Sequence, residues 1–219
     1  QYQSNGQLEL AIQLYSINAE VEYDTSEFYL RSIHNLARIY NHQREYLKAR
    51  QSIQKAFKDE NRHLKYPDLH ATSLFISAQT EDNTGNYAKA DSLMQQSLRI
   101  RRKIYKTPHR KLGNCLMSLG KYQTGLGNYS QALSLYELAR REYENNIKEN
   151  GYEMSSLLFN IGNAHHKTGN YKSDIDYKTR GLKIQKKYAP NDYERAAFLH
   201  NIGVSYLKPV SFTHLTLPT

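Results

Sequence analysis

The chain has 219 residues, of which 39% are hydrophobic and 23% are charged, and its net charge is +9. No run of about 18 apolar residues occurs, so we expect no membrane-spanning helix. The single cysteine excludes a disulfide within the chain, which is compatible with a reducing compartment, and we expect a cytoplasmic location.

The first 25 residues carry the pattern of a helix that follows a turn. Gly6-Gln7-Leu8 is followed by Ala11, Leu14 and Tyr15 at helical spacing. We interpret residues 1–25 as the second helix of a partial repeat. This start in the middle of a unit leads us to expect that the native N-terminus is missing.

Helix pairs then recur at a nearly constant period. Small residues in the first helices and tyrosines after the turns repeat every 41 or 42 residues: Ala37, Ala78, Gly120, Gly162 and Gly203, and Tyr46, Tyr87, Tyr129 and Tyr171. Such a period indicates stacked repeats, because one pair cannot bury its own apolar face. We assign 26–66 to repeat 1, 67–108 to repeat 2, 109–150 to repeat 3, 151–190 to repeat 4 and 191–208 to the first helix of repeat 5.

The turns between paired helices are punctuated by Gly-Asn. Glycine favours the left-handed conformation that ends a helix, and asparagine can cap the next helix. The turn at Arg44 lacks glycine, so its geometry is less defined by sequence. Pro67 is typical of a helix start, where a missing N–H breaks no hydrogen bond.

Two repeats depart from the pattern. In repeat 2, Ser77 and Glu81 replace apolar and aromatic residues, and we expect looser packing there. In repeat 4, Asp174 and Lys178 replace alanine and a large apolar residue. We expect a small helix rotation that brings Ile175 and Tyr177 into the core instead.

Pro209 is expected to end the last helix. The tail 209–219 has no helical period and resembles a translated sequencing adapter, with a short disordered terminus as the alternative. We exclude it from the repeats.

The sequence holds no phosphate loop, nucleophile elbow or zinc-protease motif, so we expect no enzyme activity, no cofactor and no metal site. His165 and His166 are adjacent on a helix and cannot chelate one ion together. We expect His165 to fill a core position and Cys115 to be a buried, unreactive thiol.

The pattern resembles the tetratricopeptide repeat. It combines large apolar, small and aromatic positions with Gly-x-Tyr-x2-Ala, as in Ile33, Leu36, Ala37 and Tyr40, and again in Leu199, Ile202, Gly203 and Tyr206. The common repeat has about 34 residues, and the longer period resembles kinesin light chains and bacterial regulatory proteins. The resemblance implies an all-α, right-handed superhelical solenoid of antiparallel pairs with about ten helices.

The resemblance also implies a concave groove lined by the first helices. Polar residues recur there at i and i+3, which is one helix face. The predicted groove residues are Arg31, His34, Asn35, Arg38, His42, Lys121, Phe159, Asn160, Asn163, His166, Lys167, His200 and Asn201. Asparagines could clamp a peptide backbone, and Arg38, Lys121 and Lys167 could pair with carboxylates. The alternative is a row of ordinary solvated side chains. Arg101 is expected on the outer surface.

We therefore predict a scaffold that binds an extended, acidic peptide or protein segment. The alternative is a regulatory input region for an output domain in the same protein: a caspase-like protease, a histidine kinase or a DNA-binding domain. Direct nucleic-acid binding by the basic surface is a third, disfavoured interpretation, since the cations late in the second helices, such as Arg102 and Lys187, suit the helix dipole.

Overall fold

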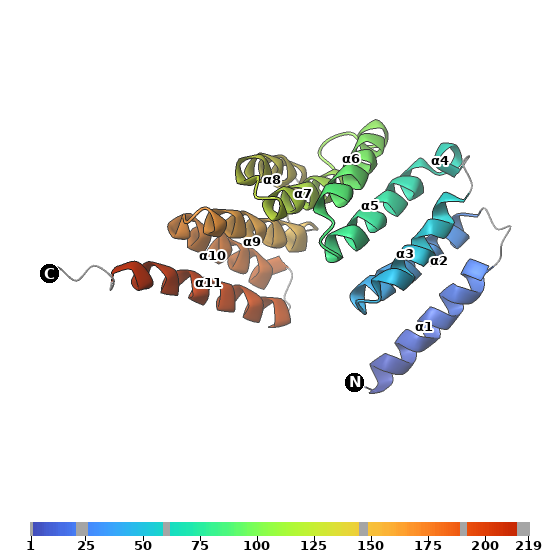
Figure 1. Cartoon of the computed structure of the whole chain (residues 1–219), viewed down its shortest axis with the longest axis horizontal. Coiled ribbons are helices and arrows are strands. Elements are labelled where there is room, and N and C mark those ends of the chain that lie inside the picture. The colour runs from blue at the N-terminus through green and yellow to red at the C-terminus, as the bar shows by residue number, and fades with distance from the viewer. Residues whose placement is uncertain (1, 21–25, 59–61, 145–148, 189–191, 214–219) are drawn as a thin grey trace. The chain divides into compact units, whose positions relative to one another are not determined.

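The computed structural model describes residues 2–20, 26–58, 62–144, 149–188 and 192–213, and every regular element in this part is helical (Figure 1). The chain forms two compact units, Gln1–Ile104 and Tyr105–Thr219. Among the described residues, no helix is both long and apolar enough to cross a membrane.

The first unit contains two helix pairs preceded by a single helix. Its elements are α1 (Tyr2–Glu20), α2 (Glu27–His42), α3 (Tyr46–Gln54), the 3-10 turn η1 (Lys55–Phe57), α4 (Arg62–Lys65), α5 (Pro67–Asn83) and α6 (Tyr87–Ile104). Pro67 occupies the first turn of α5, as predicted. One core cluster joins α1 to α2, with Ala19, Leu30 and Ile33 buried together.

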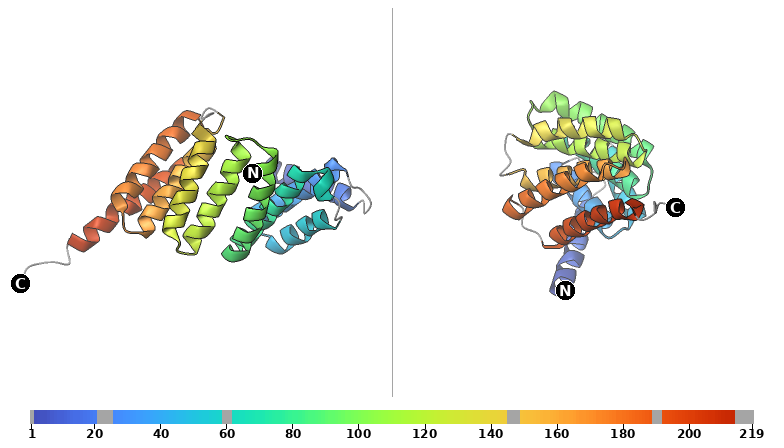
Figure 2. Two further views of the ribbon diagram at one scale, coloured as in Figure 1. Left: turned by 90° about the horizontal axis from the view of Figure 1, so that it is seen from above. Right: turned by 90° about the vertical axis from the view of Figure 1, so that its left-hand side faces the viewer.

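The second unit contains two helix pairs followed by a single helix. Its helices are α7 (Arg110–Gly125), α8 (Tyr129–Glu144), α9 (Gly151–Lys167), α10 (Tyr171–Tyr188) and α11 (Asp192–Thr213). Each helix packs against the next along the chain, and the views of Figure 2 show them as successive antiparallel rods. The antiparallel helix pairs are therefore confirmed.

The turns confirm the glycine prediction. Gly85, Gly127 and Gly169 have φ of 79°, 84° and 78°, and Arg44 adopts the same left-handed conformation with φ of 64°. The first turn thus keeps the geometry without glycine. Of the three asparagines, Asn170 caps the following helix by accepting a hydrogen bond from the Ser173 backbone N–H.

Small residues in the first helices allow close approach of the second helices. A Cβ added at Gly120 would lie 2.4 Å from the Tyr136 ring, and one added at Gly162 would lie 2.9 Å from Lys178 Cγ. Both distances are shorter than real Cβ contacts, so glycine is required at these crossings.

The last helix does not end at Pro209. α11 continues to Thr213, so that prediction was wrong. Proline's fixed φ is compatible with a helix, and its missing N–H removes one backbone hydrogen bond without forcing the chain to stop.

Candidate functional site

The open face of α2 carries three of the predicted groove residues. Asn35 is half-buried, whereas Arg38 and His42 are exposed. Arg31, on the same helix, is engaged locally, since its Nε donates a 2.7 Å hydrogen bond to Glu27. This part of the first unit therefore offers an amide and cations to solvent.

His34 does not lie on this open face. It is buried against α5, where its Nε2 is 2.7 Å from Ser73 Oγ. Burial, followed by the positive charges of Arg38 and Arg31, lowers the pKa of His34 to about 3. The prediction that His34 lines an accessible groove was wrong, because this position faces the neighbouring first helix.

The prediction that Arg101 lies on the outer surface was also wrong. Arg101 is only 4% exposed. Its guanidinium lies 3.2 Å from Thr72 Oγ1, 3.8 Å from Asp68 and 5.1 Å from the Phe75 ring centre. Desolvation and the positive charge of Arg101 lower the pKa of Arg38, so the two cations lie close enough to repel each other.

The second unit presents a longer polar face. Lys121 on α7 is exposed, and α9 shows Asn160 and Asn163 half-buried with Lys167 exposed. These three α9 residues follow one another at i, i+3 and i+7, so they share one side of the helix. On α11, His200 is exposed and Asn201 is half-buried.

Phe159 and His166, also predicted for the groove, turn toward α11. The Phe159 ring packs edge-to-face on Phe198 at 4.9 Å. His166 Nδ1 lies 3.4 Å from Ser205 Oγ. Both side chains therefore join neighbouring first helices rather than lining an open surface.

In each of these contacts the two residues are 39 positions apart, a spacing that the groove prediction did not take into account. His34 pairs with Ser73, Asn41 donates a 2.9 Å hydrogen bond to Thr80, and His166 meets Ser205. Phe159 and Phe198 are separated by the same interval. Since adjacent first helices run parallel, polar residues that recur 39 apart mark positions between the helices and not on the groove.

The core between α9 and α10 holds a buried ion pair. Asp174 and Lys178 are 0% and 2% exposed, and Lys178 Nζ lies 2.7 Å from Asp174 Oδ1. The expected rotation toward Ile175 and Tyr177 was wrong, since both are only half-buried. The helix keeps its register because the two charges neutralise each other inside the core.

Asp174 also connects three helices. Its Oδ2 lies 2.8 Å from His166 Nδ1 of α9 and accepts a hydrogen bond from the Ser205 hydroxyl of α11. Although serine, histidine and aspartate meet here, the order is not that of a hydrolase triad, in which histidine stands between the other two. Ser205 is fully buried and its hydroxyl binds the carboxylate directly, which fits a structural network.

Repeat 2 contains a second buried carboxylate. Glu81 is 4% exposed and contacts Lys89 at 2.9 Å, Arg50 at 3.1 Å and Asn86 at 2.9 Å. Burial raises the pKa of Glu81, but the hydrogen bonds from Lys89 and Asn86 and the charge of Arg50 outweigh it, so the pKa lies below the usual value. Glu81 is therefore buried and paired with opposite charges. It does not leave the core of repeat 2 underfilled, which was the reason for expecting looser packing there.

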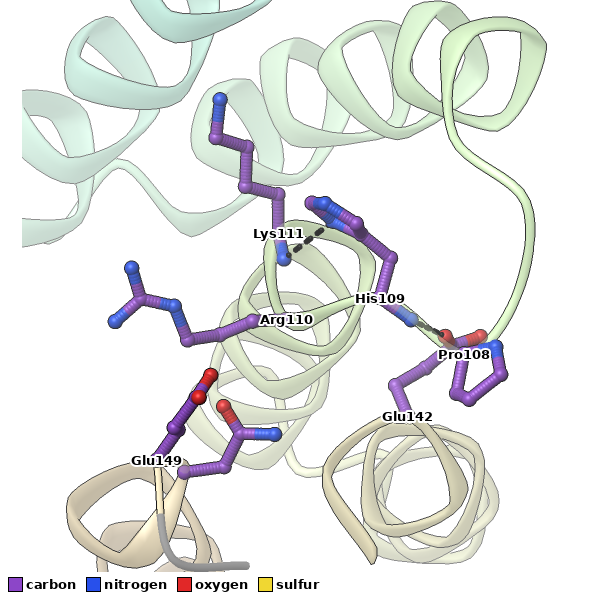
Figure 3. Close-up of a pocket in the computed structure, with 7 residues that line it drawn as sticks. Pro108, His109, Arg110, Lys111, Glu142 and Glu149 are labelled. Carbon is purple, nitrogen blue, oxygen red and sulfur yellow. Dashed lines mark hydrogen bonds between the residues drawn. The ribbon is translucent and has the colours of Figure 1, made fainter. Parts of the chain in front are cut away.

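A cavity of about 510 Å³ lies in the second unit near the start of α7 (Figure 3). Its lining residues come from the loop before α7, from the first turn of α7, from α8 and from the segment before α9: Pro108, His109, Arg110, Lys111, Glu142, Glu149 and Asn150. The His109 backbone N–H donates a 2.7 Å hydrogen bond to Glu142, and Arg110 pairs with Glu153 at 3.1 Å. No predicted site residue lines this cavity. Within the described ranges, no cluster of side chains has the composition of a metal site.

Part of the chain matches a known family of helical repeats. Residues 71–145 match the family model of the tetratricopeptide repeat. This segment carries tetratricopeptide repeats. The matched segment spans the end of the first unit and the start of the second, and the same turn and helix-pair geometry occurs on either side of it. No curated protein sequence matches the chain.

Solved tetratricopeptide-type structures share the fold. BtubC (BKLC) from P. vanneervenii is 18% identical, with a TM-score of 0.73, covering 94% of this chain and 85% of that one. A Rap protein complexed with Competence and Sporulation Factor is 18% identical with a TM-score of 0.70, covering 91% and 53%. A signal-transduction ATPase with a tetratricopeptide repeat sensor, from Pyrococcus horikoshii, is 20% identical with a TM-score of 0.70, covering 93% and 31%. At these identities the likeness establishes the fold.

Tetratricopeptide repeats form a scaffold for protein–protein interaction, with function residing in the side chains that each array displays. In this chain, the side chains displayed on the first helices include amides and cations. Cys115, by contrast, is buried as predicted.

Proposed function

We propose that the open face of the first helices binds an extended, acidic segment of a partner protein. The observation that carries the proposal is the set of half-buried amides and exposed cations on one side of α9: Asn160, Asn163 and Lys167. Each asparagine offers both a donor and an acceptor to a peptide backbone. Lys167 would contact carboxylates of the same segment.

Two further features support this proposal. Lys121 on α7 and Arg38 on α2 are exposed cations at the matching helix position, so the preference for acidic side chains would recur in both units. In addition, a Rap protein with the same fold forms a complex with Competence and Sporulation Factor.

Fluorescence polarisation with labelled extended peptides tests the proposal. An acidic peptide should bind more tightly than a neutral peptide of equal length, and its affinity should fall as salt rises, because exposed charges are screened beyond about 8–10 Å. Asn160→Ala should weaken binding by about 1–3 kcal/mol for either peptide through loss of amide hydrogen bonds.

Charge-reversal variants distinguish binding to the open face from nonspecific attraction to the basic surface of the chain. Lys121→Glu should weaken the acidic peptide and spare the neutral one. Lys186→Glu is the matched control, because Lys186 is exposed on α10, a second helix. If Lys186→Glu weakened binding as much as Lys121→Glu, nonspecific attraction to the +9 chain would be the better account.

A second candidate is a sensor region within a longer signalling protein. It is favoured by the likeness to the signal-transduction ATPase, of which this chain covers 31%. The native open reading frame tests it: a protease, kinase or DNA-binding domain following the repeats would support a sensor, whereas further repeats would support a scaffold.

A further inference from the structure

The end of α6 and the segment that follows it carry most of the net charge of the chain. Between Asp91 and Glu137 the sequence contains eight arginines and lysines and no acidic residue, so this stretch carries +8 of the net +9. Four of these cations are exposed and follow one another closely: Arg99, Arg102 and Lys103 near the end of α6, and Lys106 two residues after the helix. The three on the helix are spaced at i, i+3 and i+4, so they share one face.

These cations lack the carboxylate partners that cations on other second helices have. In α8, Arg140 and Arg141 lie 2.7 Å and 3.5 Å from Glu137 of the same helix. In α10, Arg180 lies 3.4 Å from Asp176. Within the described residues, none of the four exposed side chains at the end of α6 forms an ion pair or a hydrogen bond. The helix dipole favours cations here, but it supplies only about half a negative charge, so most of the positive charge is uncompensated.

We propose that this basic stretch, residues 99–106, binds the phosphate backbone of a nucleic acid without reading its bases. Arginine and lysine side chains donate hydrogen bonds and accept none, so the stretch requires a partner that offers closely spaced anionic acceptors. A phosphodiester backbone supplies such acceptors at every nucleotide. Arg99 and Arg102 can each bind a phosphate through two parallel hydrogen bonds, and such contacts carry no sequence information.

The neighbouring side chains favour a nucleic acid over an acidic protein or a membrane. Protein interfaces depend on aromatic or aliphatic anchors, and helices that lie on membranes insert an apolar face. Among residues 99–106, Ile104 is the one exposed large hydrophobic residue, at 39%. Tyr105 is half-buried, and its ring stacks on His109 with ring centres 3.8 Å apart. The stretch therefore offers charge without an apolar anchor. It belongs to a second helix, whereas the proposed peptide-binding face belongs to the first helices.

The salt dependence of binding tests this proposal, because each phosphate that a cation neutralises releases counterions. Fluorescence anisotropy of a short labelled DNA duplex gives the dissociation constant. With four phosphate contacts, the affinity should fall roughly 100-fold between about 50 mM and 200 mM salt. A second duplex of different sequence should give the same curve, because the contacts are to the backbone.

The triple variant Arg99→Gln/Arg102→Gln/Lys103→Gln removes three of the four contacts. It should lower the slope of log affinity against log salt by about 3, since each phosphate contact contributes about one unit. All three side chains are exposed, so the fold should be retained, and far-UV circular dichroism of the variant checks this.

The matched control is Lys183→Gln/Lys186→Gln/Lys187→Gln, which removes the same charge at the same spacing from the end of α10, where all three lysines are exposed. Its salt slope should equal that of the wild type. An unchanged slope in the α6 variant, an equal loss in the two variants, or tighter binding to polyglutamate or to anionic lipid vesicles than to the duplex would each overturn the proposal. This test does not involve the peptide-binding face.

Discussion

The buried Asp174–Lys178 pair makes a quantitative prediction for the stability of the second unit. Both side chains are at most 2% exposed and lie 2.7 Å apart. Removing one partner leaves the other charge buried without this counter-ion, and breaking a buried pair in this way typically destabilises a protein by about 3–5 kcal/mol. We therefore expect Lys178→Met, which keeps the aliphatic volume, and Asp174→Ala each to lower the free energy of unfolding by that amount.

The double variant Asp174→Ala/Lys178→Met should behave differently. It copies Ala90 and Met94 from repeat 2, both of which are 0% exposed. Its free energy of unfolding should lie within about 1 kcal/mol of the wild-type value or exceed it by about 1–4 kcal/mol. Urea unfolding of the wild type, the two single variants and the double variant, followed by far-UV circular dichroism, gives the four free energies of this double-mutant cycle. A double variant as unstable as the sum of the two single variants would refute the reasoning, because it would mean that the residues contribute independently.

Two other perturbations test neighbouring contacts. His34 has a folded pKa of about 3 against 6.5 when unfolded, so between these values the unfolded chain binds a proton that the folded chain excludes. Stability should therefore fall with pH below 6.5, by about 2 kcal/mol from pH 7 to pH 5, and His34→Gln should remove this component in urea titrations at both pH values. Gly162→Ala should lower the free energy of unfolding by about 1–3 kcal/mol, because the added Cβ would clash with Lys178, and the urea midpoint should fall accordingly. Gly203→Ala, in open space, should instead be neutral or stabilising; equal effects at the two sites would contradict the assigned helix crossings.

Much of the fold was predictable because it depends on local, repeated constraints. Gly127 marks a left-handed turn, Gly120 marks a close crossing and Pro67 marks a helix start. Each of these residue types has few alternative uses in a helical chain. Because the period is constant, each repeat supports the assignment of the others. The position of the turn at Arg44 could therefore be predicted although that turn lacks glycine.

The side-chain environment was less predictable because it depends on partners distant in sequence. Asp174 and Lys178 look unsuitable for a core until His166 and Ser205 are seen beside them. Arg101 reads as a surface cation near a helix end, yet it is buried beside Asp68. The same limit applies to the candidate site: the sequence assigned both Asn160 and His166 to the groove, and it did not separate the half-buried Asn160 from His166, which faces α11.

The central claim, that the open face of the first helices binds an acidic segment, is tested most directly by site-specific photo-crosslinking. A benzophenone amino acid replaces Asn163 on the open face of α9, or Arg180, which is exposed on α10. With a labelled acidic peptide, we predict crosslinking from position 163 that unlabelled peptide suppresses, and only background from position 180. Equal capture at the two positions, or capture at position 180 alone, would contradict the account.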